Sequence, residues 1–205
     1  MMDLHAGFEY NSAPGRVVFG SGTVQRLPEE LTRRSLSSSL ILTTPEQSSH
    51  ATAIRDLLTS RGAIQANAIK IFTKATMQTP THITAQGVEV ATSSSPATDC
   101  IISIGGGSTI GLGKAISWRT GLHHVCLPTT YAGSEMTPIL GETADGLKTT
   151  RTDPRILSGT VIYDVEFTMT LPPGLTATSG INAIAHSSSF CPVHPAIPTV
   201  SVPPP

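Results

Sequence analysis

Three consecutive glycines followed by a hydroxyl residue are the part of this chain that most directly indicates chemistry. They lie between an apolar run that ends at Ile104 and a second apolar stretch that starts at Ile110. Glycine lets the backbone approach a ligand closely, and a helix that starts after such a turn offers free N–H groups and the positive end of its dipole. Ser108 can cap that helix or bond a phosphate oxygen. A phosphate or pyrophosphate site is therefore predicted at Gly105, Gly106, Gly107 and Ser108.

The alternative for this segment is a tight strand-to-helix turn without a ligand. Its sequence is neither GxGxxG nor a Walker A motif, so neither standard assignment applies. A second polar loop, residues 128–135, directly follows the next apolar run and contains Thr129, Thr130 and Ser134. Ligands of open parallel sheets collect beyond the carboxyl ends of the strands. These hydroxyls suit a ribose, phosphate or carboxamide, or else belong to an ordinary Thr/Ser-rich loop. Two such loops after consecutive strands favour a shared ligand.

Asn182 and His186 form a third candidate, within a helix expected over residues 173–186. Residues four apart share one face of a helix. His186 in that setting is a proton donor or a metal ligand, or else a structural histidine, which is the commoner role of a lone histidine on a helix. The sequence leaves these alternatives open.

The elements that must position these residues alternate regularly between short apolar runs and helical stretches. The expected strands are residues 17–19, 40–43, 68–72, 100–104, 125–127 and 161–163. The expected helices are residues 23–33, 46–61, 81–91 and 110–118. The last strand follows what reads as an irregular polar stretch. Continuous apolar strands separated by helices predict an α/β fold with a parallel sheet covered on both faces.

The composition excludes several classes of function. The 205 residues carry a net charge of -1, and only 4% are aromatic, which argues against nucleic-acid binding. No apolar run approaches the roughly 20 residues that span a bilayer, and the first residues lack the pattern of a secretory signal. The three cysteines are too few and too scattered for a disulfide framework or zinc cluster. We expect a cytoplasmic protein that binds neither nucleic acid nor membranes.

The end of the chain differs from the rest. No Asp, Glu, Lys or Arg occurs after Glu166, and six of the last fourteen residues are proline. Prolines at this density prevent both helix propagation and strand pairing. We therefore expect residues 187–205 to form a disordered or non-native tail.

Taken together, the three candidate segments resemble the iron-containing, or group III, alcohol dehydrogenase family, and within it most of all the maleylacetate reductases. The segments that carry the resemblance are residues 105–108 with Lys114, 128–137 and 180–186. The resemblance implies a dinucleotide-binding α/β domain, here residues 1–171, of the dehydroquinate synthase-like type. An all-helical domain would follow, of which residues 172–186 are the start, with the active site between the two.

The resemblance also implies a role for each matching residue. The glycines and Ser108 would hold the pyrophosphate of NAD(P)H, with Thr129 and Thr130 near the nicotinamide and its ribose. Thr43 and Thr44 would face the adenosine ribose; neither is acidic, so both NADH and NADPH are expected as cofactors. The remaining implied contacts with cofactor or substrate come from Ser134, Lys148 and His186, the last as proton donor.

Two positions depart from the family pattern. Gly111 stands where the glycine motif usually continues to an aspartate, and Asn182 stands where metal-dependent members have an aspartate. A neutral amide is a poorer ligand for a hard cation than a carboxylate, so no metal is expected.

The implied reaction is reduction of maleylacetate, an unsaturated keto acid, to 3-oxoadipate in aromatic catabolism. The wider family acts on alcohols and carbonyl compounds. The alternative is a truncated, inactive nucleotide-binding fragment or regulatory module, because the helical domain is absent from the sequence. A homodimer is left open for a full-length protein.

Overall fold

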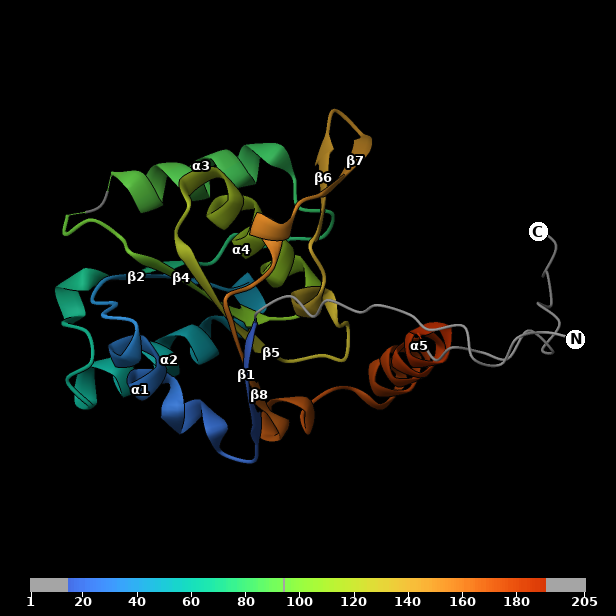
Figure 1. Cartoon of the computed structure of the whole chain (residues 1–205), viewed down its shortest axis with the longest axis horizontal. Helices are drawn as coiled ribbons and strands as arrows, with labels where there is room; N and C mark the ends of the chain where they lie inside the picture. The colour runs from blue at the N-terminus through green and yellow to red at the C-terminus, as the bar shows by residue number, and fades with distance from the viewer. Residues whose placement is uncertain (1–14, 94, 191–205) are drawn as a thin grey trace, which may run out of the picture.

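A six-stranded parallel sheet forms the centre of the computed structural model, which describes residues 15–93 and 95–190 (Figure 1). Its strands run in the spatial order β1-β8-β5-β4-β2-β3. They are β1 (Arg16–Gly20), β2 (Ser39–Leu42), β3 (Ile69–Phe72), β4 (Cys100–Gly105), β5 (His123–Pro128) and β8 (Thr160–Asp164). All neighbouring pairs in this sheet are parallel, which confirms the expected α/β class.

Helices cover both faces of the sheet, as the apolar strands require. Neighbouring strand residues point to opposite faces, so Ile41 and Ile102 pack in one core while Leu40 and Ile101 pack in the other. The first core is covered by α1 (Leu27–Arg33) and α2 (Ser48–Ser60), and the second by α3 (Thr81–Thr92) and α4 (Gly107–Thr120). Six short 3-10 helices complete the connections: η1 (Thr23–Arg26), η2 (Pro45–Gln47), η3 (Ala66–Ala68), η4 (Ser134–Met136), η5 (Pro154–Ile156) and η6 (Val165–Thr168).

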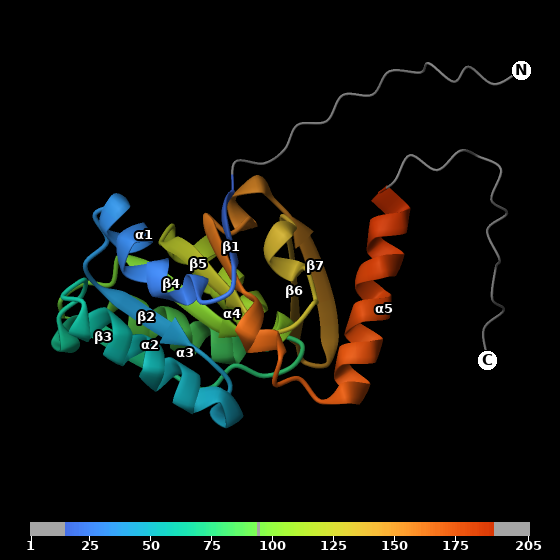
Figure 2. The same cartoon turned by 90° about the horizontal axis from the view of Figure 1, so that it is seen from below.

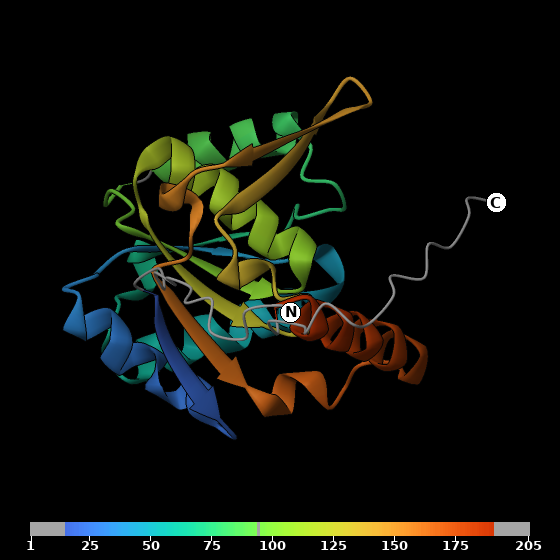
Figure 3. The same cartoon turned by 45° about the vertical axis from the view of Figure 1, so that its right-hand side comes forward.

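The stretch before β8 is not irregular, as the sequence suggested, but contains an antiparallel hairpin. Its strands are β6 (Ile139–Ala144) and β7 (Leu147–Thr152), and it projects beside α4 (Figure 3). Asp145 and Gly146 both have positive φ, 50° and 77°, which suits a two-residue hairpin turn. Every residue of β7 is exposed, so this strand lacks the apolar alternation that marks a strand in sequence.

Polar contacts with α4 hold the hairpin in place. The Arg151 guanidinium lies over the Trp118 ring, 4.2 Å from its centroid. The Arg119 guanidinium pairs with the Glu142 carboxylate at 2.9 Å. The hairpin therefore keeps a fixed relation to α4, although it contributes no strand to the main sheet.

The last described helix, α5 (Pro173–Phe190), stands apart from the sheet (Figure 2). It extends beyond His186, so the expectation that a disordered tail begins at residue 187 is wrong at that boundary. The first proline beyond His186 is Pro192, so Ser187, Ser188 and Ser189 meet no proline that would stop the helix. Residues 191–205 of the expected tail lie outside the described residues. Within the described parts of the chain, no helix has the length and apolarity needed to cross a bilayer.

His124, on β5, is the centre of a buried polar network beneath α4. Its Nε2 lies 2.8 Å from the Ser103 hydroxyl and its Nδ1 lies 3.2 Å from the Ser158 hydroxyl. A Cβ on Gly113 would lie only 2.2 Å from Nε2, so α4 can pack over the ring only because this residue is glycine. Burial, reinforced by the nearby Lys114 charge, lowers the pKa of His124 to about 3.

This lowered pKa predicts a loss of stability in mild acid. The unfolded chain takes up a proton on this histidine below about pH 6.5, whereas the native protein stays neutral there down to about pH 3. The free energy of unfolding should therefore fall by about 1.4 kcal/mol per pH unit for this group as the pH drops below about 6. His123, whose pKa burial lowers to about 4, acts in the same direction. Urea unfolding of the wild type and His124→Gln at pH 7 and pH 5 measures the effect. We expect a shallower pH dependence in the variant; equal slopes would contradict this role of His124.

Candidate functional site

The candidate site lies where the order of the sheet reverses, at the carboxyl ends of β2 and β4. These strands are neighbours, but the chain leaves β2 for β3 on one side and β4 for β5 on the other. In open α/β sheets this reversal creates a crevice that binds ligands. The Gln47 amide after β2 donates to the Thr129 hydroxyl after β5 at 3.3 Å, and the Thr129 N–H donates to the Gly105 carbonyl at 3.1 Å. The loops after all three strands therefore meet at this edge.

The glycine turn is packed so tightly that side chains are excluded from it. Gly105 has a φ of 153°, and a Cβ there would lie 2.4 Å from the Thr109 hydroxyl. A Cβ on Gly106 would lie 3.0 Å from the Thr130 methyl group, in the loop after β5. Because both glycines are needed for this packing, the turn brings its backbone, rather than side chains, to the open edge of the sheet.

Helix α4 begins at Gly107, directly after the turn and earlier than the sequence indicated. Its N-cap residue is Gly106, and no side chain caps the helix, so the suggested capping role of Ser108 is wrong. Gly107 and Ser108 instead form the first turn, where N–H groups have no acceptor within the helix. Both residues are half-buried and accessible. This geometry leaves two N–H groups and one hydroxyl available to an anion.

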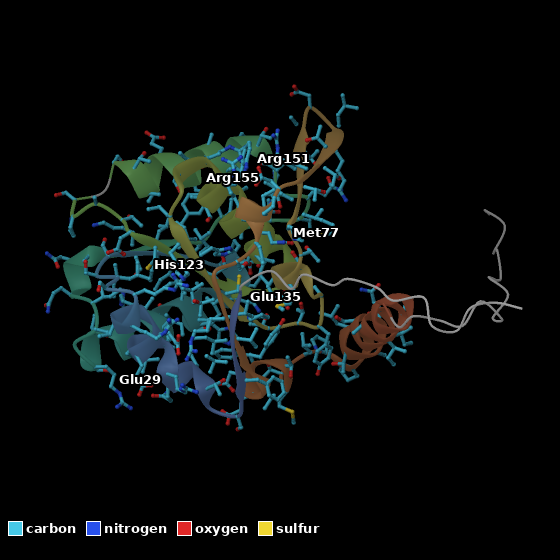
Figure 4. All side chains as sticks on the ribbon, in the orientation of Figure 1. Glu29, Met77, His123, Glu135, Arg151 and Arg155 are labelled. Carbon is cyan, nitrogen blue, oxygen red and sulfur yellow. The ribbon has the colours of Figure 1, made fainter. Side chains whose placement is uncertain are left out.

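A pocket of about 290 Å³ opens at this helix end. It brings together four residues singled out from the sequence. Gly107 and Ser108 line it from α4, Lys148 lines it from the hairpin, and Met77, which is labelled in Figure 4, also lines it. The four sequence-predicted lining residues are Gly107, Ser108, Ser134 and Lys148.

The other predicted residues do not line this pocket. Thr43 is fully buried and its hydroxyl donates to the Gln47 carbonyl at 3.3 Å, so it holds the turn after β2, and only the half-buried Thr44 is left to face a ligand. Thr129 is buried under the glycine turn, and Thr130 lines a second pocket. Asn182 is exposed on α5, and the side chain of His186 lies outside the described part of the structure.

Gly111, which stands where the family pattern usually has an aspartate, lies directly against Thr79. A Cβ on Gly111 would lie 2.6 Å from the Thr79 hydroxyl oxygen. Thr79 is itself buried and lines the 290 Å³ pocket. The space that a side chain at position 111 would need is therefore taken by a residue from a different segment.

The second pocket, about 310 Å³, lies beyond the ends of β1, β5 and β8 and contains a buried acid that sequence reasoning missed. Glu135 is 2% exposed, and its Oε1 accepts a 2.6 Å hydrogen bond from the Tyr163 hydroxyl. Its Oε2 has no hydrogen-bond partner among the described residues. Burial, together with the Glu135 carboxylate, raises the pKa of Tyr163 well above its usual value. The hydrogen bond between these two side chains holds η4 against β8. In the sequence, the only sign of a buried acid here was a glutamate placed among apolar and hydroxyl residues.

Comparisons with known proteins show which family the chain resembles. A family model described as iron-containing alcohol dehydrogenase matches residues 14–165. The chain is 47% identical to a maleylacetate reductase of Rhizobium sp. strain MTP-10005, over 88% of this chain and 49% of that protein. It is 43% identical to a maleylacetate reductase of Burkholderia cepacia, over 95% and 53%. A crystal structure of maleylacetate reductase from Agrobacterium tumefaciens superposes with a TM-score of 0.81 at 44% identity, over 88% and 49%. The chain thus spans about half the length of these relatives.

Removing the Tyr163 hydroxyl tests the contact that anchors η4. Tyr163→Phe leaves both oxygens of the buried Glu135 carboxylate without a hydrogen-bond partner in the described parts of the chain, so we expect the free energy of unfolding to fall by about 2 kcal/mol. Tyr131→Phe is the matched control, because Tyr131 is 39% exposed and should change stability by less than about 0.5 kcal/mol. Urea unfolding measures both. Equal stabilities of the two variants would show that the contact is unimportant.

Proposed function

The chain belongs to the iron-containing alcohol dehydrogenase family, and on this basis we propose that it provides the NAD(P)H-binding part of a maleylacetate reductase. The observation that carries the proposal is the pocket at the start of α4, where free N–H groups meet residues of two other loops. Two observations support the proposal: this geometry, and the relatives that are 40–47% identical to the chain, which are maleylacetate reductases.

The residues present fit a dinucleotide. The pyrophosphate suits the N–H groups of Gly107 and Ser108, since Gly105 and Gly106 keep side chains out of the turn. The Lys148 ammonium, exposed on the facing hairpin, supplies a positive charge to the same pocket. Thr44 is left for the adenosine ribose, and since neither Thr43 nor Thr44 is acidic we propose that NADH and NADPH both bind. The Glu46 carboxylate, which contacts the Thr44 side chain, favours the free ribose of NADH.

When bound, NAD(P)H supplies a hydride from its nicotinamide ring. Maleylacetate carries a C=C bond conjugated to a ketone, so hydride addition to one alkene carbon leaves an enolate and protonation of the other carbon gives 3-oxoadipate. The chain must therefore orient the substrate beside the cofactor, exclude water and deliver one proton. Thr130 and Ser134 are our candidates for orientation, and His186 on α5 is our candidate for the proton donor.

The family name implies iron, whereas we propose that this chain needs none, because the neutral amide of Asn182 is a poor ligand for a hard cation. Among the described residues, no three His, Cys, Asp or Glu side chains lie close enough together to hold a metal ion. Asn182, at the position of the usual carboxylate ligand, presents an exposed neutral amide.

A second candidate is nucleotide binding without turnover. The α5 side chains of Leu175, Ile181 and Ile184 are 47%, 67% and 70% exposed, so none of the described residues packs over these apolar side chains. His186 belongs to the same helix. A pocket that binds the cofactor but does not exclude water would act as a binding module.

Substituting Ser108 tests cofactor binding at the start of α4. No described residue is hydrogen-bonded to its hydroxyl, so Ser108→Ala should leave stability unchanged. We expect the Kd for NADH, measured by fluorescence titration, to rise about tenfold through the loss of a hydrogen bond to a charged phosphate. Ser60→Ala, at the far end of α2, is the control and should bind as the wild type does. NADH binding that is insensitive to Ser108→Ala would place the cofactor elsewhere.

An assay with maleylacetate separates the two candidates. We expect the protein to consume NADH when maleylacetate is added, followed at 340 nm, and His186→Gln to lower kcat by a factor of about 100 or more. NADH binding without consumption would favour the binding module. Full activity of His186→Gln would remove His186 as the proton donor.

A further inference from the structure

Lys114 is a fully buried cation whose side chain holds a loop of the pocket. It lies on α4 and has no exposed surface. Its ammonium donates to the carbonyl of Ser134, to the carbonyl of Thr137 at 2.7 Å and to the carbonyl of Ile139 at 3.0 Å. The Thr137 hydroxyl lies 3.2 Å away. All four oxygens belong to one short segment, residues 134–139.

The electrostatics of this arrangement show why it is specific. Removing an ammonium from water is costly unless oxygens surround it, and burial lowers the pKa of Lys114 to about 8. The Glu135 carboxylate, held by the Tyr163 hydroxyl, acts against that shift. A lysine offers three donors that can turn toward converging oxygens, whereas the planar guanidinium of arginine cannot converge on them in the same way.

The segment held by Lys114 forms one wall of the 290 Å³ pocket, and the helix that bears Lys114 forms the other. Ser134 and Ile139 line the pocket from the segment, while Gly107 and Ser108 line it from the first turn of α4. Ile139 is also the first residue of β6, so the same contact fixes where the hairpin starts. One buried ammonium, about two turns along α4 from Gly107, therefore joins this helix to a segment that lines the same pocket as the first turn of α4.

We propose that Lys114 is a positioning residue for the cofactor: by holding residues 134–139 against α4 it sets the width of the pocket beside Gly107 and Ser108. This inference rests on the proposed function. Lys114 itself touches no ligand, because it is fully buried. Its loss would release the Ser134 wall while leaving the first turn of α4 and the loop after β2 intact, since neither depends on its ammonium.

The test compares Lys114→Met with Lys74→Met in the full chain. Lys74 is exposed, and its ammonium contacts Gln86 and the Phe72 ring among the residues the structure describes, so its variant controls for the loss of a lysine. NADH affinity is measured by fluorescence titration at a temperature where melting curves show each protein fully folded. We expect the Kd for NADH to rise at least tenfold in Lys114→Met and not to change in Lys74→Met.

A second ligand separates positioning from general loss of structure. AMP carries the adenosine and one phosphate, which the N–H groups of the first turn of α4 can hold without contact with the Ser134 wall, so we expect its Kd to change less than twofold in Lys114→Met. Equal weakening of NADH and AMP would mean that Lys114 only stabilises the fold. Unchanged NADH affinity in a folded Lys114→Met would overturn the inference while leaving the proposed function in place. A wild type that binds no NADH would overturn both.

A milder variant decides the matter if Lys114→Met does not fold. Thr137→Val removes one of the four oxygens around the ammonium and keeps the charge and all three carbonyls. We expect a two- to fourfold rise in the Kd for NADH with the Kd for AMP unchanged. NADH binding equal to that of the wild type would count against the role of Lys114.

Discussion

The contact between the glycine turn and the loop after β5 is the constraint on which the site depends. Gly106 faces Thr130 so closely that any Cβ would crowd the threonine methyl group, and Gly105 leaves no room beside Thr109. Because side chains are excluded, α4 can start at Gly107, at the edge where the strands end. The free N–H groups, the adjoining pocket and the hydroxyls of two loops all follow from this close approach of backbone to neighbouring side chains.

Beneath that edge, the fold buries several polar groups and matches most of them with partners. The His124 ring lies between two serine hydroxyls, and the Lys114 ammonium is surrounded by oxygens of residues 134–139. Burying such groups without partners would cost several kcal/mol each. Their geometry is therefore strongly specified, and both networks involve α4, the helix that presents the first turn to the pocket. These two networks hold α4 in a fixed position relative to the loops that line the pocket.

The sequence allowed the main sheet and the glycine turn between β4 and α4 to be predicted, because both depend on local patterns. Buried parallel strands are continuous apolar runs, and the glycine turn lies directly between such a strand and α4. The family resemblance is likewise confirmed by the match over residues 14–165. The β6–β7 hairpin was missed because its outer strand is exposed throughout and so carries no apolar alternation, although Asp145 and Gly146 were a usable turn signal. The contacts of Lys114 and Tyr163 join residues 20 to 28 positions apart, which no local pattern reveals.

A crystal structure of the protein with NADH bound tests the central claim most directly, because it shows where the phosphates lie. The account predicts pyrophosphate oxygens within about 3 Å of the N–H groups of Gly107 and Ser108, with the adenosine near Thr44 and the nicotinamide half extending along the wall that contains Ser134. Pyrophosphate density in the apolar pocket beside Tyr163, or at any place away from the first turn of α4, would contradict it.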